Sequence, residues 1–330
     1  MKILLAIPLA IGLTITSAAP ALAAPPLQVV FDTDMGNDVD DALALAMLHA
    51  FISRGEVDLL AVTVSKDNPW AAEYIRLVDE YYGRGGIPVG IVHDGKTPED
   101  GLYVRQVCEF HGRRPGKTID AVELLRKTLA AEKDGAVTLI QVGFSTNLAR
   151  LIESAPDRYS TLSGMELVKK KVRLLTVMAG NFAESKPEYN VLTDVPAATK
   201  LFATWPTAIY ISGFEVGMAI LYPASSIEHD FPTDNPVVEA YRAYAKMPYD
   251  RPTWDLTTVL YDLRPDRGYF DVSPPGDVTV AEDGATGFQP NAQGKRYVLR
   301  VNPMQAARIQ DALVWLSSEP KEPSQKTRSN

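Results

Sequence analysis

The sequence predicts an α/β fold: a doubly wound, mostly parallel open sheet with helices on both faces. Two observations lead to this prediction. Short apolar, β-branched runs alternate along the chain with longer amphipathic stretches, which is the pattern of consecutive βαβ units. The short runs are apolar throughout rather than at every second position, as strands that are buried on both faces require.

The expected elements follow this alternation from the amino-terminal side to Tyr222. The apolar runs expected to form strands are Leu27–Asp32, Val57–Val64, Ile87–Val92, Val137–Val142, Val172–Met178 and Ala208–Ile211. The amphipathic stretches expected to form helices are Asp40–Ile52, Ala71–Tyr82, Ile119–Glu132, Asn147–Glu153 and Val195–Ala203.

After Tyr222 the alternation is less regular, and a Pro-rich stretch runs from Phe231 to Pro236. The elements expected beyond it are a helix Val237–Lys246, a helix that begins near Asp255, β-like runs at Tyr269–Val272, Val278–Val280 and Tyr297–Val301, and a closing helix Met304–Leu316. No internal repeat or separating linker is visible. We therefore expect a single catalytic domain that spans residues 24–316.

The two ends of the chain are expected to lie outside this domain. Lys2, an apolar run from Ile3 to about Ile15 and the small residues up to Ala23 have the order of a signal peptide that is cleaved after Ala23. A membrane anchor is the alternative, but the run is shorter than the roughly 20 apolar residues of a span. We therefore expect residues 1–23 to direct export to the periplasm or outside, and the polar residues 317–330 to form a disordered tail.

Composition excludes some classes of partner. The formal net charge is −8 and basic clusters are lacking, which argues against binding to nucleic acid or to a membrane surface. An acidic chain can, however, hold cations. The single Cys108 excludes an intramolecular disulfide, so a folded core has to provide the stability.

The most informative segment is the acidic cluster that follows the first expected strand. It reads Asp32-Thr-Asp34-Met-Gly-Asn-Asp38-Val-Asp40-Asp41-Ala and passes from a strand through a Gly turn into a helix. Helix capping accounts for one Asp, whereas Asp32 and Asp34 stand at a strand end with no capping role. Carboxylates this close repel one another unless a cation offsets them, and oxygen ligands without His or Cys indicate Ca²⁺ or Mg²⁺ rather than Zn²⁺.

This segment resembles the amino-terminal signature of the inosine-uridine preferring nucleoside hydrolase family, an Asp-x-Asp-x-Gly followed by Asp-Asp-Ala. The spacing differs from the signature, because Asn37-Asp38-Val39 stands between the Gly and Asp40-Asp41. Either a two-residue insertion preserves the pair Asp40-Asp41, or Asp38 replaces one member of it.

Three later segments resemble the same family and appear in the family's order. They are the turn Gly143-Phe-Ser-Thr146-Asn147-Leu-Ala, the run Met178-Ala-Gly-Asn181 with Glu188-Tyr-Asn190 and Asp194-Val-Pro-Ala-Ala, and the segment Arg251-Pro-Thr-Trp254-Asp255. With the first segment they extend from Leu27 to about Leu316. Asp34, Asp67, Thr146 and Asn181 each follow an expected strand, and parallel sheets bind ligands at that edge.

The resemblance implies a calcium-dependent hydrolase that cleaves the N-glycosidic bond of ribonucleosides or of another small N-glycoside. It implies that the metal ligands are Asp34, Asp41, the Thr146 carbonyl and Asp255, and that Asp34 is also the general base that activates the metal-bound water. The residues implied to bind substrate are Asp40, Asp67, Asn181, Glu188, Asn190 and Trp254. It also implies a homo-oligomer, a dimer or a tetramer.

Trp254 is typical of the purine-preferring branch, in which the ring stacks on the base, so a preference for purine nucleosides is expected. Plain core packing is the other interpretation of Trp254. No acid for the leaving base is identified, because Trp254 stands where other members carry His.

Two functions of other classes remain open from the sequence. Asp32-Thr-Asp34 also fits the strand end of a haloacid dehalogenase-type phosphatase, in which Asp32 would be the nucleophile, but Gly36 occupies the place of the required Thr. A non-catalytic exported protein that binds a nucleoside or sugar is the second alternative. The presence of both Asp34 and Asp255 argues against it.

Overall fold

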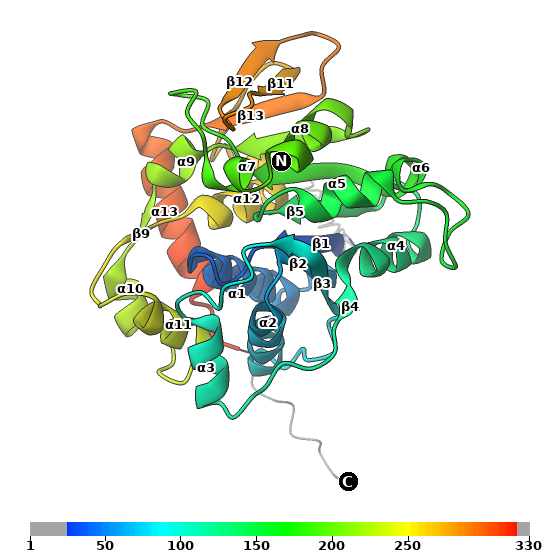
Figure 1. Ribbon diagram of the computed structural model, residues 1–330. Helices are drawn as coiled ribbons and strands as arrows, with labels where there is room; N and C mark the ends of the chain where they lie inside the picture. The colour runs from blue at the N-terminus through cyan, green and yellow to red at the C-terminus, as the bar shows by residue number, and fades with distance from the viewer. Residues whose placement is uncertain (1–24, 322–330) are drawn as a thin grey trace, which may run out of the picture.

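The computed structural model describes residues 25–321 (Figure 1). The strands are β1 Leu27–Thr33, β2 Val57–Lys66, β3 Val89–Lys96, β4 Ile119–Asp120, β5 Val137–Gln141, β6 Val172–Met178, β7 Ala208–Ser212, β8 Leu221–Tyr222, β9 Arg251–Pro252, β10 Asp271–Val272, β11 Gly276–Val280, β12 Thr286–Pro290 and β13 Arg296–Arg300. The longer helices are α1 Asp40–Ser53, α2 Pro69–Tyr81, α4 Ala121–Ala131, α5 Thr146–Glu153, α6 Gly164–Lys171, α8 Val195–Thr204, α11 Pro236–Tyr244, α12 Trp254–Leu263 and α13 Pro303–Ser317. The shorter ones are α3 Val104–Phe110, α7 Tyr189–Thr193, α9 Phe214–Met218, α10 Ala224–His229 and the 3₁₀ turn η1 Pro265–Arg267.

The main sheet has the strand order β12-β11-β13-β7-β6-β5-β1-β2-β3-β4, with β10 paired to β13. From β13 to β4 each neighbouring pair is parallel, whereas β11 pairs antiparallel with both β12 and β13. The predicted fold class, a mostly parallel open sheet between helices, is confirmed. The sheet is mixed at one edge, where β11 and β12 form a hairpin (Figure 1).

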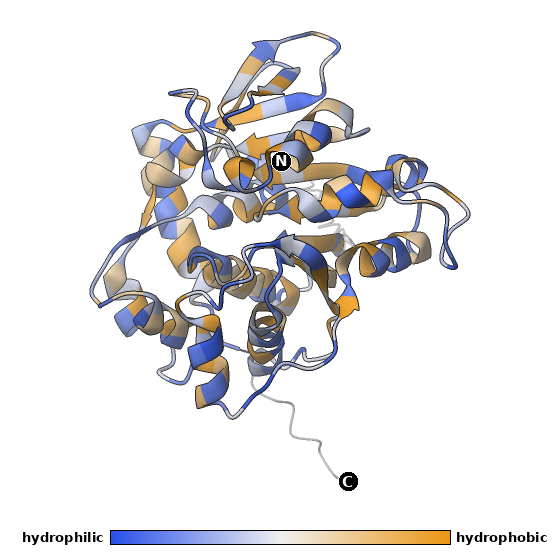
Figure 2. Cartoon of the chain, viewed as in Figure 1, coloured by the Kyte–Doolittle hydropathy of each residue, from blue (hydrophilic) through white to orange (hydrophobic). Residues whose placement is uncertain are grey.

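The sheet is buried on both faces, as the apolar strands predicted. Val29 and Phe31 of β1 belong to the core under α1, α2, α11, α12 and α13, whereas Val30 belongs to the core under α4, α5, α6 and α8. All three side chains are fully buried. In Figure 2 the surrounding helices carry both hydrophilic and hydrophobic residues, as helices that cover a sheet do.

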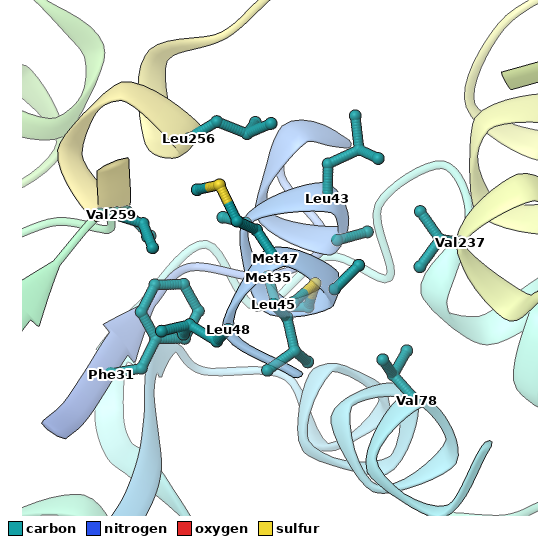
Figure 3. Packing of buried hydrophobic residues seen from close by; sticks show 14 of the residues in the cluster. Phe31, Met35, Leu43, Leu45, Met47, Leu48, Val78, Val237, Leu256 and Val259 are labelled. Carbon is teal, nitrogen blue, oxygen red and sulfur yellow. The ribbon is translucent and has the colours of Figure 1, made fainter. Parts of the chain in front are cut away.

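Helix α1 is buried on all sides, a feature that it shares with α12, in which every residue from Asp255 to Leu263 is buried. It packs against β2 and against α11, α12 and α13, so every residue from Asp40 to Phe51 is buried. Figure 3 shows Met47 and Leu48 of α1 among Phe31, Leu256 and Val259. Each such side chain contributes roughly 1.5–3 kcal/mol by its burial, and together they fix the start of α1, where Asp40 and Asp41 lie.

The direction in which the chain crosses the sheet reverses at β1. Strands β2 and β3 follow on one side of β1, and β5, β6 and β7 follow on the other. In open α/β sheets the crevice at the carboxyl ends of the strands at such a point binds ligands. Asp34 stands at the end of β1 and therefore lies at this crevice.

The chain ends differ partly from the prediction. Ser317 is the last residue of α13 and is buried, and its hydroxyl donates a hydrogen bond of 2.7 Å to Leu313 O. A disordered tail that begins at Ser317 is therefore wrong at that residue. The predicted signal peptide and residues 322–330 lie outside the described residues. Within residues 25–321, no helix is both long and apolar enough to cross a membrane.

Candidate active site

A cavity of about 560 Å³ opens at the carboxyl ends of β1, β5 and β6. Six of the residues predicted from the sequence line it: Asp34, Asn181, Glu188, Asn190, Trp254 and Asp255. Asp38, which the sequence left open as an alternative metal ligand, also lines it, and residues without a predicted role complete much of the wall, among them Asn37, Phe214, Tyr244 and Arg251. Of the four residues predicted to meet at this edge of the sheet, Asp34 and Asn181 line the cavity, whereas Asp67 and Thr146 do not.

Asp34 is positioned by the turn after β5. A Cβ on Gly143 would stand 2.5 Å from Asp34 N and 2.8 Å from Thr33 C, so only glycine allows this close approach. Asp34 Oδ2 accepts a hydrogen bond of 2.7 Å from Asn37 Nδ2. Burial, together with the nearby Asp38 carboxylate, raises the pKa of Asp34 to about 7.

Asp40 and Asp41 form the first turn of α1 beneath the cavity. Thr33 Oγ1 donates a hydrogen bond to Asp41 Oδ1, and Asp255 N donates one of 3.2 Å to Asp40 Oδ2. Asp40 Oδ1 and Asp41 Oδ2 are buried and have no hydrogen-bond partner within the described chain. Burial and the neighbouring carboxylates raise the pKa of both residues and of Asp255 well above 3.8. Buried carboxylate oxygens of this kind need a cation or a proton.

The donor set fits a hard divalent cation. Asp38, Asp40 and Asp255 each offer an oxygen, and these oxygens lie within 4.8 Å of one another. With Asp34 and Asp41 nearby, the side chains offered are all carboxylates, the donors that Ca²⁺ and Mg²⁺ prefer. Asp38 also forms an ion pair of 2.8 Å with Arg251, whereas Asp41 Oδ2 has no partner.

Four of the ten predicted site residues do not line the cavity: Asp40 and Asp41, which lie beneath it, and Thr146 and Asp67. Thr146 is the first residue of α5, and its hydroxyl donates a hydrogen bond of 2.5 Å to Asp194 Oδ2. Asp67 Oδ2 accepts one of 2.9 Å from Gly95 N near the end of β3. The predicted roles of the Thr146 carbonyl in metal binding and of Asp67 in substrate binding stay predictions.

Glu188 and Asn190 hold the wall of the cavity together. Glu188 is the N-cap of α7 and accepts hydrogen bonds of 2.9 Å from Gly180 N and from Asn190 N. Asn190 Nδ2 donates to Val142 O over 2.7 Å and to Met178 O over 3.2 Å. Both side chains therefore connect the ends of β5 and β6 to α7. Asn181 Oδ1 accepts a hydrogen bond of 3.0 Å from Glu184 N.

Aromatic rings and one cation form the side of the cavity around Trp254. The Trp254 ring stacks on Phe214 at a centroid distance of 5.5 Å, and its Nε1 donates to Phe214 O over 3.1 Å. The Arg251 guanidinium lies 5.1 Å from the Trp254 ring centroid and 5.0 Å from that of Tyr244. Because Phe214 and Arg251 both contact the indole, stacking of a base on Trp254 stays a prediction.

The sequence did not predict a role in the site for Arg251, Asn37 or Lys66. Lys66 is buried, and its Nζ donates hydrogen bonds of 2.8 Å to Asn37 Oδ1 and 2.7 Å to Thr97 O. Asn37 belongs to the departure from the family signature, and Arg251 stands three residues before Trp254. A search for unusual residues within the recognised motifs could have found these two, whereas Lys66 carried no such signal.

The phosphatase alternative required Asp32 as an exposed nucleophile. Asp32 is buried and does not line the cavity, and its Oδ2 accepts hydrogen bonds of 2.5 Å from Thr63 and 2.8 Å from Asn147. Burial raises the pKa of this carboxyl to about 7. Asp32 thus ties β1 to β2 and α5, and the phosphatase alternative has no accessible nucleophile.

Comparison with known proteins is consistent with this geometry. Residues 29–309 match the family described as inosine-uridine preferring nucleoside hydrolase. The pyrimidine-specific ribonucleoside hydrolase RihA of Citrobacter koseri is 28% identical over 225 residues, which is 64% of this chain and 67% of that protein. An inosine-uridine preferring nucleoside hydrolase from Bacillus anthracis has the same fold, with a TM-score of 0.66 at 20% identity over 88% of this chain and 99% of the other. A purine-preferring ribonucleoside hydrolase from Gardnerella vaginalis has a TM-score of 0.65 at 15% identity over the same shares. The match over residues 29–309 shows that the chain belongs to the inosine-uridine preferring nucleoside hydrolase family and is a hydrolase that acts on N-glycosyl compounds.

Proposed function

We propose that this protein is a calcium-dependent hydrolase of ribonucleosides that prefers purine bases and uses Asp34 as its general base. The observation that carries the proposal is the pair of buried carboxylate oxygens, Asp40 Oδ1 and Asp41 Oδ2, that lack hydrogen-bond partners beneath the cavity. They lie beside Asp34 and Asp255, which line the same cavity. A cation there would neutralise carboxylates that otherwise repel one another.

Calcium is favoured over zinc by the chemistry of the donors. Asp34, Asp41 and Asp255 would hold the ion with carboxylate oxygens, and the Thr146 carbonyl is proposed as a further ligand. When bound, Ca²⁺ supplies the positive charge that lowers the pKa of a coordinated water, though less strongly than Zn²⁺ does. A carboxylate base is therefore still required, and Asp34 is the candidate.

In the proposed reaction, one residue of this chain activates the water and others hold the sugar. Asp34 takes a proton from the water while the water oxygen forms a bond to C1′ and the bond from C1′ to the base nitrogen breaks. The base leaves with the electron pair of that bond, through a sugar with oxocarbenium character. Asp40 and Asn181 would hold ribose hydroxyls, with Glu188 and Asn190 completing the pocket; contacts that strengthen as the bond breaks lower the barrier.

Purine preference rests on the aromatic wall. Trp254, Phe214, Tyr189 and Tyr244 line the cavity, and a two-ring base offers these rings more overlap than a one-ring base. Because the chain is similar to the pyrimidine-specific RihA, a preference for pyrimidine nucleosides is the result that the measurement has to exclude. The deciding measurement is kcat/KM for inosine, guanosine, adenosine, uridine and cytidine, with release of free ribose as the readout.

The metal and the base are tested together. Protein treated with a chelator and dialysed should lose ribose release, and Ca²⁺ should restore it; restoration by Zn²⁺ alone would overturn the calcium assignment. Asp34→Asn should lower kcat by roughly 10²–10⁴-fold, the usual size of a general-base contribution. Asp58→Asn, which changes an exposed carboxylate at the start of β2, is the matched control and should leave activity unchanged. A protein that binds nucleosides without turnover under all these conditions would be a binding protein.

Export is proposed on the sequence of residues 1–23 alone. Expression of the full chain in a bacterial host, followed by cell fractionation and amino-terminal sequencing, tests it. The expected product begins at Ala24 and is found in the periplasm or the medium. A full-length cytosolic product would contradict export.

A further inference from the structure

We propose that Arg251 is the residue that stabilises the leaving base: its guanidinium donates hydrogen bonds to acceptor atoms of the base and offsets the negative charge that the base acquires as the glycosidic bond breaks. This inference rests on the proposed nucleoside hydrolysis. It assigns a group to a step for which the sequence offered none, because Trp254 stands where other family members carry His.

Arg251 is held in one place by three contacts. Its Nη2 donates a hydrogen bond of 2.8 Å to Asp38 Oδ2, and its guanidinium carbon lies 5.0 Å from the Tyr244 ring and 5.1 Å from the Trp254 ring. The side chain is 17% exposed and lines the cavity. A guanidinium fixed in this way is preorganised, so little ordering is needed when a substrate binds.

The guanidinium has unused donors. Arginine carries five N–H groups; Nη2 donates to Asp38, and the contact with the Tyr244 side chain occupies at most one more, so several stay free within residues 25–321. Nε is buried and makes no hydrogen bond there, although it forms an ion pair of 3.9 Å with Asp40 Oδ1. A buried donor without a hydrogen bond is costly, and acceptor atoms of a ligand in the cavity can supply what the protein does not.

The position suits the base rather than the far side of the sugar. On one side of Arg251 lie the carboxylates proposed to hold the metal and the ribose; its Nε is 3.9 Å from Asp40 Oδ1. On the other side lie the aromatic rings proposed to hold the base. The base is attached to C1′, next to the hydroxyl-bearing carbon of the sugar. A group between Asp40 and Trp254 is therefore close to the bond that breaks.

Arginine cannot act as a full proton donor, because the pKa of its guanidinium lies far above the pH at which the enzyme works. The base consequently leaves with the electron pair as an anion that is hydrogen-bonded to the guanidinium, and it takes its proton from water. The proton of the attacking water goes to Asp34. Electrostatic stabilisation of developing charge by a fixed donor typically changes kcat by about 10²–10³-fold.

The test compares a poor leaving group with a good one. Inosine needs its leaving base stabilised, whereas 4-nitrophenyl riboside releases a stable nitrophenolate that needs no such help. Arg251→Met keeps the volume and removes the charge, and it should lower kcat/KM about 100-fold for inosine and less than about threefold for 4-nitrophenyl riboside. Arg251→Lys keeps a positive charge but lacks the planar guanidinium with its paired N–H donors. It should lower kcat/KM by less than Arg251→Met does, again only for inosine.

Two control variants separate this role from the neighbouring contacts. Tyr244→Phe keeps the ring beside the guanidinium and removes a hydroxyl that could act as an acid, so it should not discriminate between the two substrates. Asp38→Asn removes one of the three contacts that hold the guanidinium but keeps its charge, so it should lower kcat/KM for inosine more than for 4-nitrophenyl riboside, by less than Arg251→Met does. A selective loss for inosine in Tyr244→Phe, with none in Arg251→Met, would overturn the assignment in favour of the tyrosine.

The remaining outcomes are also decisive. Equal losses for both substrates in Arg251→Met would show that Arg251 only supports the carboxylate cluster. Should Arg251→Met fail to fold, as judged by circular dichroism, Arg251→Lys decides by the same ratio. Failure of the unmodified, calcium-loaded protein on both substrates would contradict the proposed function itself, which is a different result from failure of Arg251.

Discussion

Asn37 donates a hydrogen bond of 2.7 Å to Asp34 Oδ2, and its own amide oxygen accepts one of 2.8 Å from Lys66 Nζ. The amide thus stands between a buried lysine and the proposed general base, with its orientation set by both. Asn37 belongs to the segment in which this chain departs from the family signature. Besides changing the spacing of the signature, this segment therefore provides a hydrogen bond from Asn37 to Asp34.

Removal of this contact should affect turnover more than binding. Asn37→Ala takes away a hydrogen bond to a carboxylate, and such bonds contribute roughly 1.5–3 kcal/mol. We expect kcat to fall about tenfold or more with KM nearly unchanged, because Asp34 loses its orientation while the cavity stays open. Asn291→Ala, in an exposed turn after β12, is the control for an Asn side chain elsewhere. A change in KM alone would show that Asn37 contacts substrate instead.

The two interpretations of the acidic segment are separated by their effects on calcium affinity. Asp41 Oδ2 is buried and unpartnered among residues 25–321, so Asp41→Asn should weaken calcium binding strongly, by 100-fold or more. Asp38 is partly exposed and already paired with Arg251, so Asp38→Asn should change the affinity only a few-fold. Isothermal titration calorimetry with Ca²⁺ measures both. The reverse order would make Asp38 the ligand, a role that its closeness to Asp40 and Asp255 permits.

The sequence predicted the fold well where burial dictates composition. Strand β6 was predicted with its observed bounds, and β1 and β2 were predicted to within two residues, because strands covered on both faces must be apolar throughout. Helix α3 was missed, since it has seven residues and its N-cap, Tyr103, makes no side-chain capping hydrogen bond. Hairpin strand β12 was missed because it is short and ends at Pro290.

The site was predictable only where its chemistry is concentrated in short motifs. Asp34, Asp40 and Asp41 lie within eight residues, and the density of charge identified them. Arg251 meets Asp38 across 213 residues of sequence. Such a contact depends on how β9 and α12 pack beside α1, which local patterns do not encode. The same holds for Lys66, whose burial against Asn37 follows from the loop after β3.

The close packing of Gly143 against Asp34 has a direct test. A methyl group at Gly143 would meet the backbone of Thr33 and Asp34 at less than 3 Å, and backbone atoms cannot move aside as a flexible side chain can. Gly143→Ala should therefore displace Asp34, with a loss of kcat of at least about 100-fold or an overpacking cost of roughly 1–3 kcal/mol in stability. Gly116→Ala is the matched control, because a Cβ there meets nothing within 4 Å. Wild-type activity and stability in Gly143→Ala would contradict the packing.

Acid stability should depend on Asp157. Its carboxylate accepts hydrogen bonds of 2.7 and 3.1 Å from the buried Arg126, and these bonds lower the pKa of Asp157 from 3.8 to about 2. A carboxyl whose folded pKa is depressed stabilises the fold above its unfolded pKa, and this stabilisation is lost as the pH falls through the folded pKa. We therefore expect Asp157→Asn to cost on the order of 1–2 kcal/mol at pH 7, a difference that shrinks between about pH 4 and pH 2. Urea unfolding of both proteins across this range measures it; a pH-independent difference would contradict the ion pair.

Base preference is the prediction that depends most on the cavity wall. Trp254 packs on Phe214 and beside Arg251 and keeps part of its surface toward the cavity, where a purine gains more overlap than a pyrimidine. Stacking of a base is worth roughly 1–3 kcal/mol, so inosine should exceed uridine by at least about tenfold in kcat/KM. Trp254→Ala should remove most of this difference. Trp315→Ala, which changes an exposed indole on α13 that does not line the cavity, should leave it intact. If the unmodified protein turns over uridine and inosine equally, Trp254 serves only to pack against Phe214 and to hold Arg251, and the preference for purines is wrong.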